Sequence, residues 1–180
     1  QLQLTSANLN GSLINSGSVT LTGPSISLSS ITNTGSIALS SSSSVQVTNS
    51  FSIADGSLTL ADAAQLTLPN LTLTGGSILL TSASSPATLI TPSCTYAGAT
   101  SPALIDTTPV APGQHAGAIN LNASNLPISV ADGAAPNDLT INASLQNGSI
   151  TKTGLGTLLL GGDNSSLSAG ITLQQGVLSV

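Results

Sequence analysis

The sequence predicts an all-β protein, a right-handed parallel β-helix with about 20 residues in each coil. Glycine, in most copies with Ser or Thr after it, precedes short apolar segments at about that interval, at Gly17, Gly35, Gly56, Gly76, Gly156 and Gly176. The segments alternate apolar with polar residues, which is typical of half-buried strands. Only 1% of the residues are aromatic, which favours a core of stacked aliphatic side chains over a β-sandwich.

Strands are expected wherever the alternation holds, within a single β-helix segment over residues 1–180. The clearest alternations lie at 19–22, 26–29, 45–48, 58–60, 66–68 and 71–73. Each places Leu, Ile or Val on one face of the strand and mostly polar residues on the other. Stacking these segments at the usual strand spacing predicts about seven coils.

Residues 82–117 interrupt the pattern with closely spaced prolines. Proline removes a donor from a strand ladder, so we expect an irregular Pro/Ala-rich excursion from the rod here, with one short strand at 103–105. A side loop is where a regular rod acquires specificity. The excursion is therefore the predicted contact surface, and its candidate contact residues are Cys94, Tyr96 and His115.

Composition excludes several classes of function. Only 4% of the residues are charged, and the net charge of −5 reflects six Asp against one basic residue. A single Lys cannot neutralise a run of phosphates, so nucleic-acid binding is not expected. The chain has no Met, which predicts a processed piece of a longer product. A lone Cys cannot form an intramolecular disulfide, although it can cross-link subunits.

The acidic residues do not form a recognisable catalytic or metal-binding motif. A β-helical glycosidase or lyase needs clustered carboxylates, whereas Asp beside Gly is typical of turns. We therefore expect no enzyme activity, no metal and no cofactor, and interpret the carboxylates as turn residues: Asp55, Asp62, Asp106, Asp132, Asp138 and Asp163.

The segment 138–180 resembles the passenger-associated transport repeat of Gram-negative autotransporters. The matching residues are Lys152, Gly154, Gly156, Leu158, Leu160, Gly162, Asn164, Gly170, Gly176, Leu178 and Val180. The stretch 165–168 departs from the family, which often has a Tyr-Ser-Gly turn there. The resemblance implies export to the cell surface through an outer-membrane translocator, and the upstream coils are similar in a general way to filamentous-haemagglutinin-like β-helical proteins. Apart from this motif, Lys152 is interpreted as a solvated side chain at a coil edge.

The expected function is that of a structural and adhesive rod on a bacterial cell surface, with a host or bacterial receptor as partner. An alternative is a filament subunit that stacks end to end, because both ends are expected to be uncapped coils. A carbohydrate-active enzyme and an ice-binding solenoid are less favoured alternatives. The Thr-x-Thr pairs that suggest ice binding, such as Thr20 with Thr22, are not expected to recur on every coil.

Overall fold

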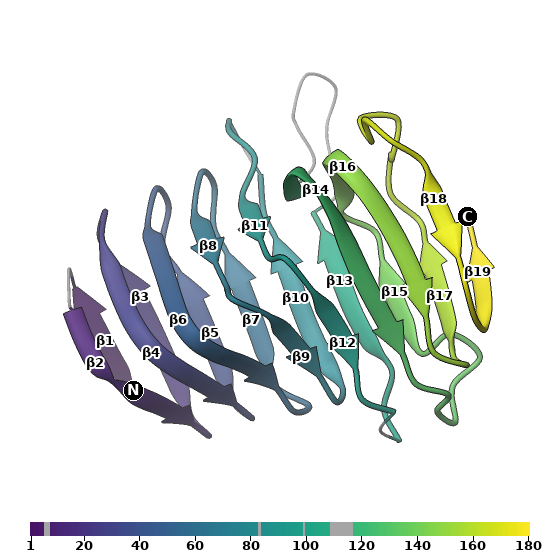
Figure 1. The fold of residues 1–180 in the computed structure, drawn as a ribbon. Coiled ribbons are helices and arrows are strands. Elements are labelled where there is room, and N and C mark those ends of the chain that lie inside the picture. The colour runs from purple at the N-terminus through teal and green to yellow at the C-terminus, as the bar shows by residue number, and fades with distance from the viewer. Residues whose placement is uncertain (6–7, 83, 99, 109–116) are drawn as a thin grey trace.

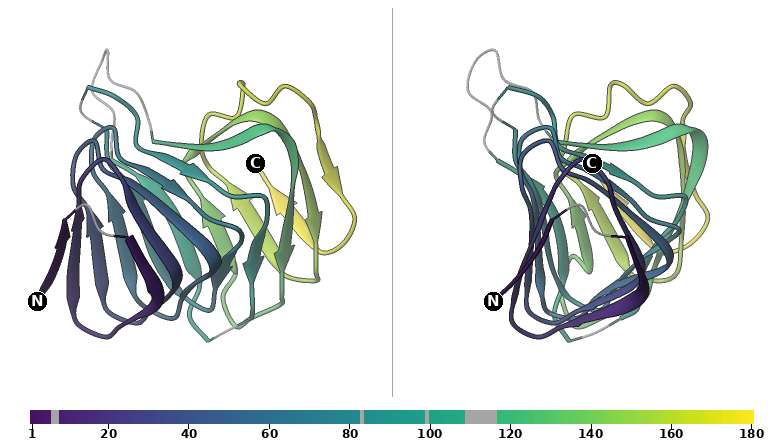
Figure 2. Two further views of the ribbon diagram at one scale, coloured as in Figure 1. Left: turned by 60° about the vertical axis from the view of Figure 1, so that its left-hand side comes forward. Right: turned by 90° about the vertical axis from the view of Figure 1, so that its left-hand side faces the viewer.

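The chain folds as a parallel β-solenoid of about eight turns with roughly 21 residues per turn. This computed structural model describes residues 1–5, 8–82, 84–98, 100–108 and 117–180. Figure 1 shows the strands side by side from the N-terminal to the C-terminal coil, and Figure 2 shows the coils stacked in end view. The predicted fold class is confirmed. The described residues include no helix that is long and apolar enough to cross a membrane.

The described strands form two sheets whose pairings are all parallel. The first sheet contains β1 (Leu2–Thr5), β3 (Ser18–Thr22), β5 (Ser36–Leu39), β7 (Ser57–Leu60), β10 (Gly76–Leu80), β13 (Ala103–Thr107), β15 (Leu139–Ile141), β17 (Thr157–Leu160) and β19 (Val177–Ser179). The second contains β2 (Asn8–Asn15), β4 (Ile26–Asn33), β6 (Ser44–Ile53), β8 (Gln65–Thr67), β9 (Leu71–Leu73), β11 (Thr88–Ile90), β12 (Cys94–Tyr96), β14 (Ala118–Val130), β16 (Ser144–Thr153) and β18 (Ile171–Leu173).

Aliphatic side chains stack in columns inside the solenoid. One column of the first sheet runs through Leu2, Val19, Ile37, Leu58, Ile78, Ile105, Ile141 and Leu160. From Val19 onward these side chains are buried. Complete burial of a Leu or Ile side chain stabilises a fold by about 1.5–3 kcal/mol, so the column holds successive coils in register.

The recurring glycine marks the turn that leads into the first sheet, where consecutive coils pack backbone against backbone. The Ser36 amide donates to the Gly17 carbonyl at 2.7 Å, and the Ser57 amide donates to the Gly35 carbonyl at 2.8 Å. A Cβ atom on Gly56 would lie 2.8 Å from the carbonyl oxygens of Asn33 and Gly35. Glycine is therefore required at this turn by the close approach of the coil before it.

Two buried asparagines satisfy the same turn in the first coils. The Asn15 Nδ2 atom donates to Asn33 Oδ1 at 2.8 Å. Each Oδ1 atom accepts the amide two residues later, from Gly17 at 3.0 Å and from Gly35 at 3.2 Å. The asparagines thus supply acceptors for the turn amides, and the Asn15 carbonyl also accepts the Gly35 amide at 3.2 Å.

The predicted excursion at 82–117 is for the most part a regular coil, which corrects the sequence interpretation. Within it, β11 pairs with β8 and β14, β12 pairs with β9 and β14, and β13 pairs with β10 and β15. This coil accounts for the extra turn relative to the predicted seven.

Longer corners account for the irregular sequence of this coil. Residues 81–87 separate β10 from β11, whereas 61–64 separate the equivalent strands β7 and β8. Pro86, Pro92 and Pro102 all lie between strands, where no ladder donor is lost. These prolines therefore lie at the corners of a regular coil, and their frequency does not indicate that the coil is missing. Pro109 and Pro112 lie outside the described residues.

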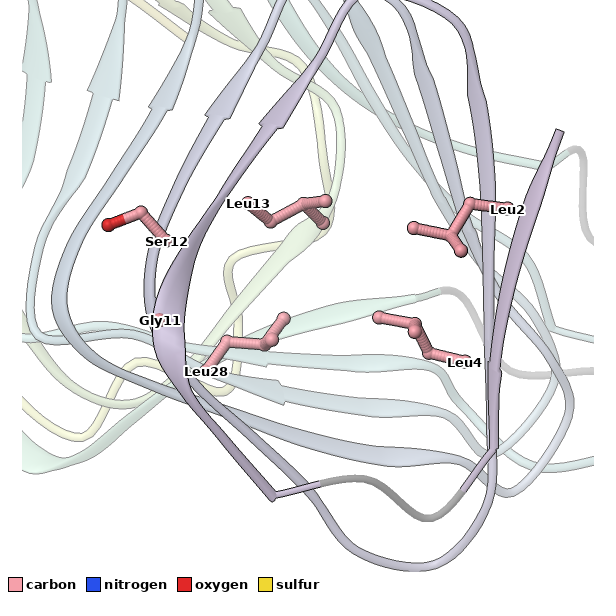
Figure 3. Close-up of a pocket in the computed structure, with 6 residues that line it drawn as sticks. All are labelled: Leu2, Leu4, Gly11, Ser12, Leu13 and Leu28. Atoms are coloured by element: carbon pink, nitrogen blue, oxygen red, sulfur yellow. The ribbon is translucent and has the colours of Figure 1, made fainter.

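The N-terminal end face opens onto the solenoid core. Figure 3 shows Leu2, Leu4 and Leu13 pointing into an apolar hollow of about 170 Å³ that Leu28 of the next coil also lines. The opposite end face carries Ile171, which is 38% exposed, and Leu173, which is 49% exposed. In the described chain, the first sheet ends at β1 and β19, whose outer edges pair with no strand.

Candidate binding surface

The two described residues of the predicted contact surface are buried, and this corrects their assignment. The side chains of Cys94 and Tyr96 point into the core from β12, with exposures of 2% and 1%. The Tyr96 hydroxyl donates to the Ser101 carbonyl at 3.0 Å. Burial raises the pKa of the Cys94 thiol to about 12, so the thiolate needed for cross-linking is suppressed. His115 lies outside the described residues.

Lys152 is buried and not solvated at a coil edge. Its side chain is 0% exposed, and its Nζ atom donates to the carbonyls of Thr153 at 2.8 Å, Gly154 at 2.7 Å and Gln175 at 3.1 Å. Desolvation lowers the pKa of the ammonium, while the negative charge of Asp138 opposes that shift. The one lysine of the chain therefore fastens the turn after β16 to the final coil, and its ammonium group is unavailable to an external anion.

The other residues of the transport-repeat match build the last coils of the solenoid. Leu158 and Leu160 are buried in β17. Asn164 accepts the Leu145 amide at 3.1 Å and donates to the Gly162 carbonyl at 3.1 Å. Gly154 and Gly176 have φ angles of 75° and 73°, which L-residues with side chains rarely adopt. These residues therefore have structural roles in holding one coil on the next.

The carboxylates of Asp62, Asp138 and Asp163 accept backbone amides at corners, whereas Asp106 lies within β13 and is not a turn residue. Asp138 accepts the Gly133 and Thr157 amides, each at 2.8 Å, and Asp62 accepts the amides of Ser84 at 2.9 Å and Ser85 at 2.8 Å. A hydrogen bond from the Ser165 backbone amide, followed by one from its side chain, lowers the pKa of Asp163. The described residues contain no group of three or more His, Cys, Asp or Glu that could hold a metal ion.

The outer face of the second sheet carries a continuous column of hydroxyl groups. The register aligns Thr32, Ser52, Thr72, Thr95, Ser129 and Thr153 on successive coils. The neighbouring column is interrupted where Pro127 pairs with Thr151. On the first sheet, Thr20 pairs with Ala38, so the Thr-x-Thr pair there does not continue. The hydroxyl column forms a neutral polar surface that is one residue wide.

Two hollows flank a bulge of β14 on the outer side of the second sheet. The register between β14 and β16 shifts between Asn120 and Ser124, and the intervening Asn122 and Ala123 have φ angles of 51° and 60°. One hollow of about 200 Å³ is lined by Thr67, Leu68, Ile90, Thr91, Pro92, Asn120, Leu121, Asn122 and Ser124. The other, of about 380 Å³, is lined by Asn120, Asn122, Ala123, Asn147 and Ser168.

The asparagines shared by the two hollows have unused hydrogen-bonding groups. Asn120 Oδ1 accepts the Asn122 amide at 3.0 Å and Asn147 Nδ2 at 3.3 Å. Within the described residues, the Asn120 Nδ2 atom and the whole side-chain amide of Asn122 have no hydrogen-bond partner. None of the described residues that line the hollows is charged. The surface therefore offers neutral donors and acceptors above an apolar floor.

Sequence reasoning did not identify these hollows, because their lining comes from five different coils. The only local signal is the pair Ser124 and Asn125, where two consecutive polar residues break a segment that otherwise alternates. A bulge is typically found where such an alternation is broken. No family model matches this chain, and comparisons with curated proteins and with solved structures find no similar protein.

Proposed function

We propose that the chain is a stiff rod segment of an exported bacterial cell-surface protein with an adhesive role. The observation that carries this proposal is the uninterrupted solenoid, whose core spans every described coil and whose outer surface is almost free of charge. The resemblance of residues 152–180 to a transport repeat supports the export route through an outer-membrane translocator. A receptor on a host or bacterial surface is the proposed partner.

A structural role fits the distribution of polar groups. The side chains of Asp62, Asp138 and Lys152 bind backbone groups at corners, and the aromatic side chains are inside the core. Most exposed polar side chains of the described residues carry hydroxyl or amide groups, which suit reversible contacts in water and not group transfer. These features favour a scaffold that presents a neutral surface.

Surface labelling of the source cells tests this proposal. Antibodies raised against the purified chain are applied to intact and to permeabilised cells, with a cytoplasmic protein as the control for leakage. We expect equal labelling in both states, and we expect added purified chain to compete with cell attachment. Labelling that requires permeabilisation would contradict the export proposal, and attachment that is indifferent to the purified chain would contradict the adhesive one.

End-to-end stacking of copies is the second candidate, favoured by the apolar side chains on both end faces. Sedimentation velocity of the purified 180-residue chain over a range of concentrations tests it. We expect assemblies that lengthen with concentration and that are lost in Leu173→Asp, since the charge would be buried between coils. Thr95→Asp, on the outer face of β12, is the control and should assemble normally. A monomer at every concentration would eliminate this candidate.

A further inference from the structure

The bulge of β14 lies beside an apolar residue in an otherwise polar column on the outer face of the second sheet. One column of outward-facing residues on the second sheet pairs in register through Ser27, Gln46, Thr67, Ile90, Asn120 and Gln146. Ile90 is the one apolar member of this column. It lines the smaller hollow together with Pro92 and directly beside Asn120. An apolar patch therefore adjoins unused amide groups at this place.

We propose that the two hollows beside the β14 bulge bind a neutral saccharide, with Asn120 and Asn122 as its hydrogen-bonding anchors. This inference deepens the adhesive function proposed above and rests on it for its biological setting. Sugar rings present hydroxyl groups at their rims and C–H groups on their faces. The site matches both, with the amides of Asn120 and Asn122 for the hydroxyls and Ile90 and Pro92 for the apolar face.

The size and the charge of the hollows select the ligand class. A volume of about 200 Å³ lies below the roughly 300–1,000 Å³ typical of drug-sized ligands, and one of about 380 Å³ lies near the lower end of that range. Each hollow thus suits a small unit such as a sugar ring, and the shared asparagines place two units side by side. Because none of the described residues that line the hollows is charged, an acidic sugar would lose hydration without gaining a cationic partner there.

A saccharide fits this place better than an extended peptide. A peptide that binds a β-sheet typically adds a strand to a free edge. Around the hollows, β11 pairs with both β8 and β14, and β14 pairs with β16. The backbone donors and acceptors of the residues paired here are therefore used within the solenoid, and recognition at the bulge is left mainly to side chains.

Glycan-array binding of the purified chain tests the proposal. The chain is presented in multivalent form on a detection antibody, because single sites of this kind bind weakly and avidity compensates. The array carries neutral oligosaccharides, acidic oligosaccharides and immobilised peptides. We expect retention on a subset of the neutral glycans, and the best of these is then titrated against the free chain by NMR.

Three variants locate the binding site. Asn122→Gly removes the side-chain amide while tolerating the positive φ, and we expect binding at least about fivefold weaker. Ile90→Thr should weaken binding comparably. Asn49→Ala is the matched control, because Asn49 is an exposed residue on β6 whose Nδ2 donates to Ser29 Oγ at 2.8 Å and which lines neither hollow. It should bind as the parent chain does, and far-ultraviolet circular dichroism checks the fold of each variant.

The outcomes separate this proposal from the adhesive function on which it rests. Retention of acidic glycans or peptides alone, no retention at all, or equal binding by folded Asn122→Gly would each overturn the saccharide site. None of these results bears on surface exposure, which the cell labelling measures by itself. If the labelling fails while neutral glycans still bind, the cell-surface proposal is contradicted and the saccharide-site proposal stands.

Discussion

Single buried polar groups determine how this nearly uncharged chain holds its coils together. Lys152 satisfies three carbonyls from two consecutive coils, and Asp138 caps two amides that lie on different coils. Each group is buried, with an exposure of 0% for Lys152 and 1% for Asp138. A buried charge is tolerated only where hydrogen bonds replace its hydration. These hydrogen bonds therefore allow both charged side chains to be buried in the solenoid.

Replacement of Lys152 by Met is expected to loosen the final coil. The substitution keeps an unbranched side chain in the core but removes three charge-assisted hydrogen bonds. We expect the free energy of unfolding to fall by about 1–3 kcal/mol and the amides of β18 to exchange faster with solvent. Hydrogen exchange with mass spectrometry and urea denaturation measure the two effects. Gln65→Met, at an exposed position of β8, should change stability by less than about 0.5 kcal/mol.

Cys94 is expected to make the fold less stable in alkali. The thiol ionises near 9.0 in the unfolded chain, whereas burial raises its folded pKa to about 12. Above pH 9 the unfolded state therefore binds fewer protons, and the free energy of unfolding falls by up to about 1.4 kcal/mol per pH unit. Urea denaturation between pH 7 and pH 10.5 measures this slope.

The variant Cys94→Ala isolates that contribution, because its cavity lowers stability by an amount independent of pH. The difference between parent and variant should shrink as the pH rises above 9. Lys152 acts in the opposite direction, since its lowered pKa makes stability rise until the unfolded lysine titrates near 10.5. Its effect is common to both proteins and cancels. A difference that stays constant across this range would mean that the thiol is not desolvated.

At the scale of the element, the turn before each strand of the first sheet sets how closely coils stack. Successive glycine carbonyls accept the serine amide of the next coil, as Gly56 does from Ser77 at 3.0 Å. The close backbone contact leaves no room for a Cβ atom within the stack. In the first coil the same position is open, because no atom lies within 4 Å of a Cβ on Gly17.

This difference predicts opposite outcomes for the same substitution at two equivalent turns. Gly56→Ala should lower the free energy of unfolding by about 1–3 kcal/mol, because the new methyl group forces backbone apart. Gly17→Ala should be neutral or slightly stabilising, since it only restricts the unfolded chain. Thermal and urea denaturation of the two variants provide the comparison. Equal effects at both turns would show that glycine is used there for flexibility and not for close approach.

The whole molecule is a stack in which each coil contacts mainly its two neighbours. Stability in such a solenoid is the sum of coil and interface terms. The central strands β7 and β10 have paired neighbours on both sides, whereas the three residues of β18 are all exposed. Order is therefore expected to decline toward the end faces.

Native-state hydrogen exchange tests this gradient. We expect the slowest exchange in β7 and β10 and the fastest in β18 and β19, because local openings at an end disrupt one interface and those in the middle disrupt two. Raising the protein concentration should slow exchange at the end coils only if copies stack there. Uniform protection along the chain would indicate a single cooperative unit in place of a graded stack.

The sequence alone determined the parallel solenoid, its repeat length and its aliphatic core. Alternation and turn chemistry are local properties, and they decide which side chains face inward. The hydroxyl column, the burial of Lys152 and the site beside Asn122 could not be read in this way. These features depend on which residues are in register on neighbouring coils. Because the corners differ in length from coil to coil, residues that meet across coils are not evenly spaced in the chain.

The region 82–117 illustrates the same division. Its prolines were visible in the sequence, yet only the tertiary structure shows that Pro86, Pro92 and Pro102 occupy corners while Cys94 and Tyr96 continue the core. A proline penalises a strand only where its missing amide would have bonded to the next coil. Local patterns thus established what each segment is, and the stacking of coils decided which of its side chains reach solvent.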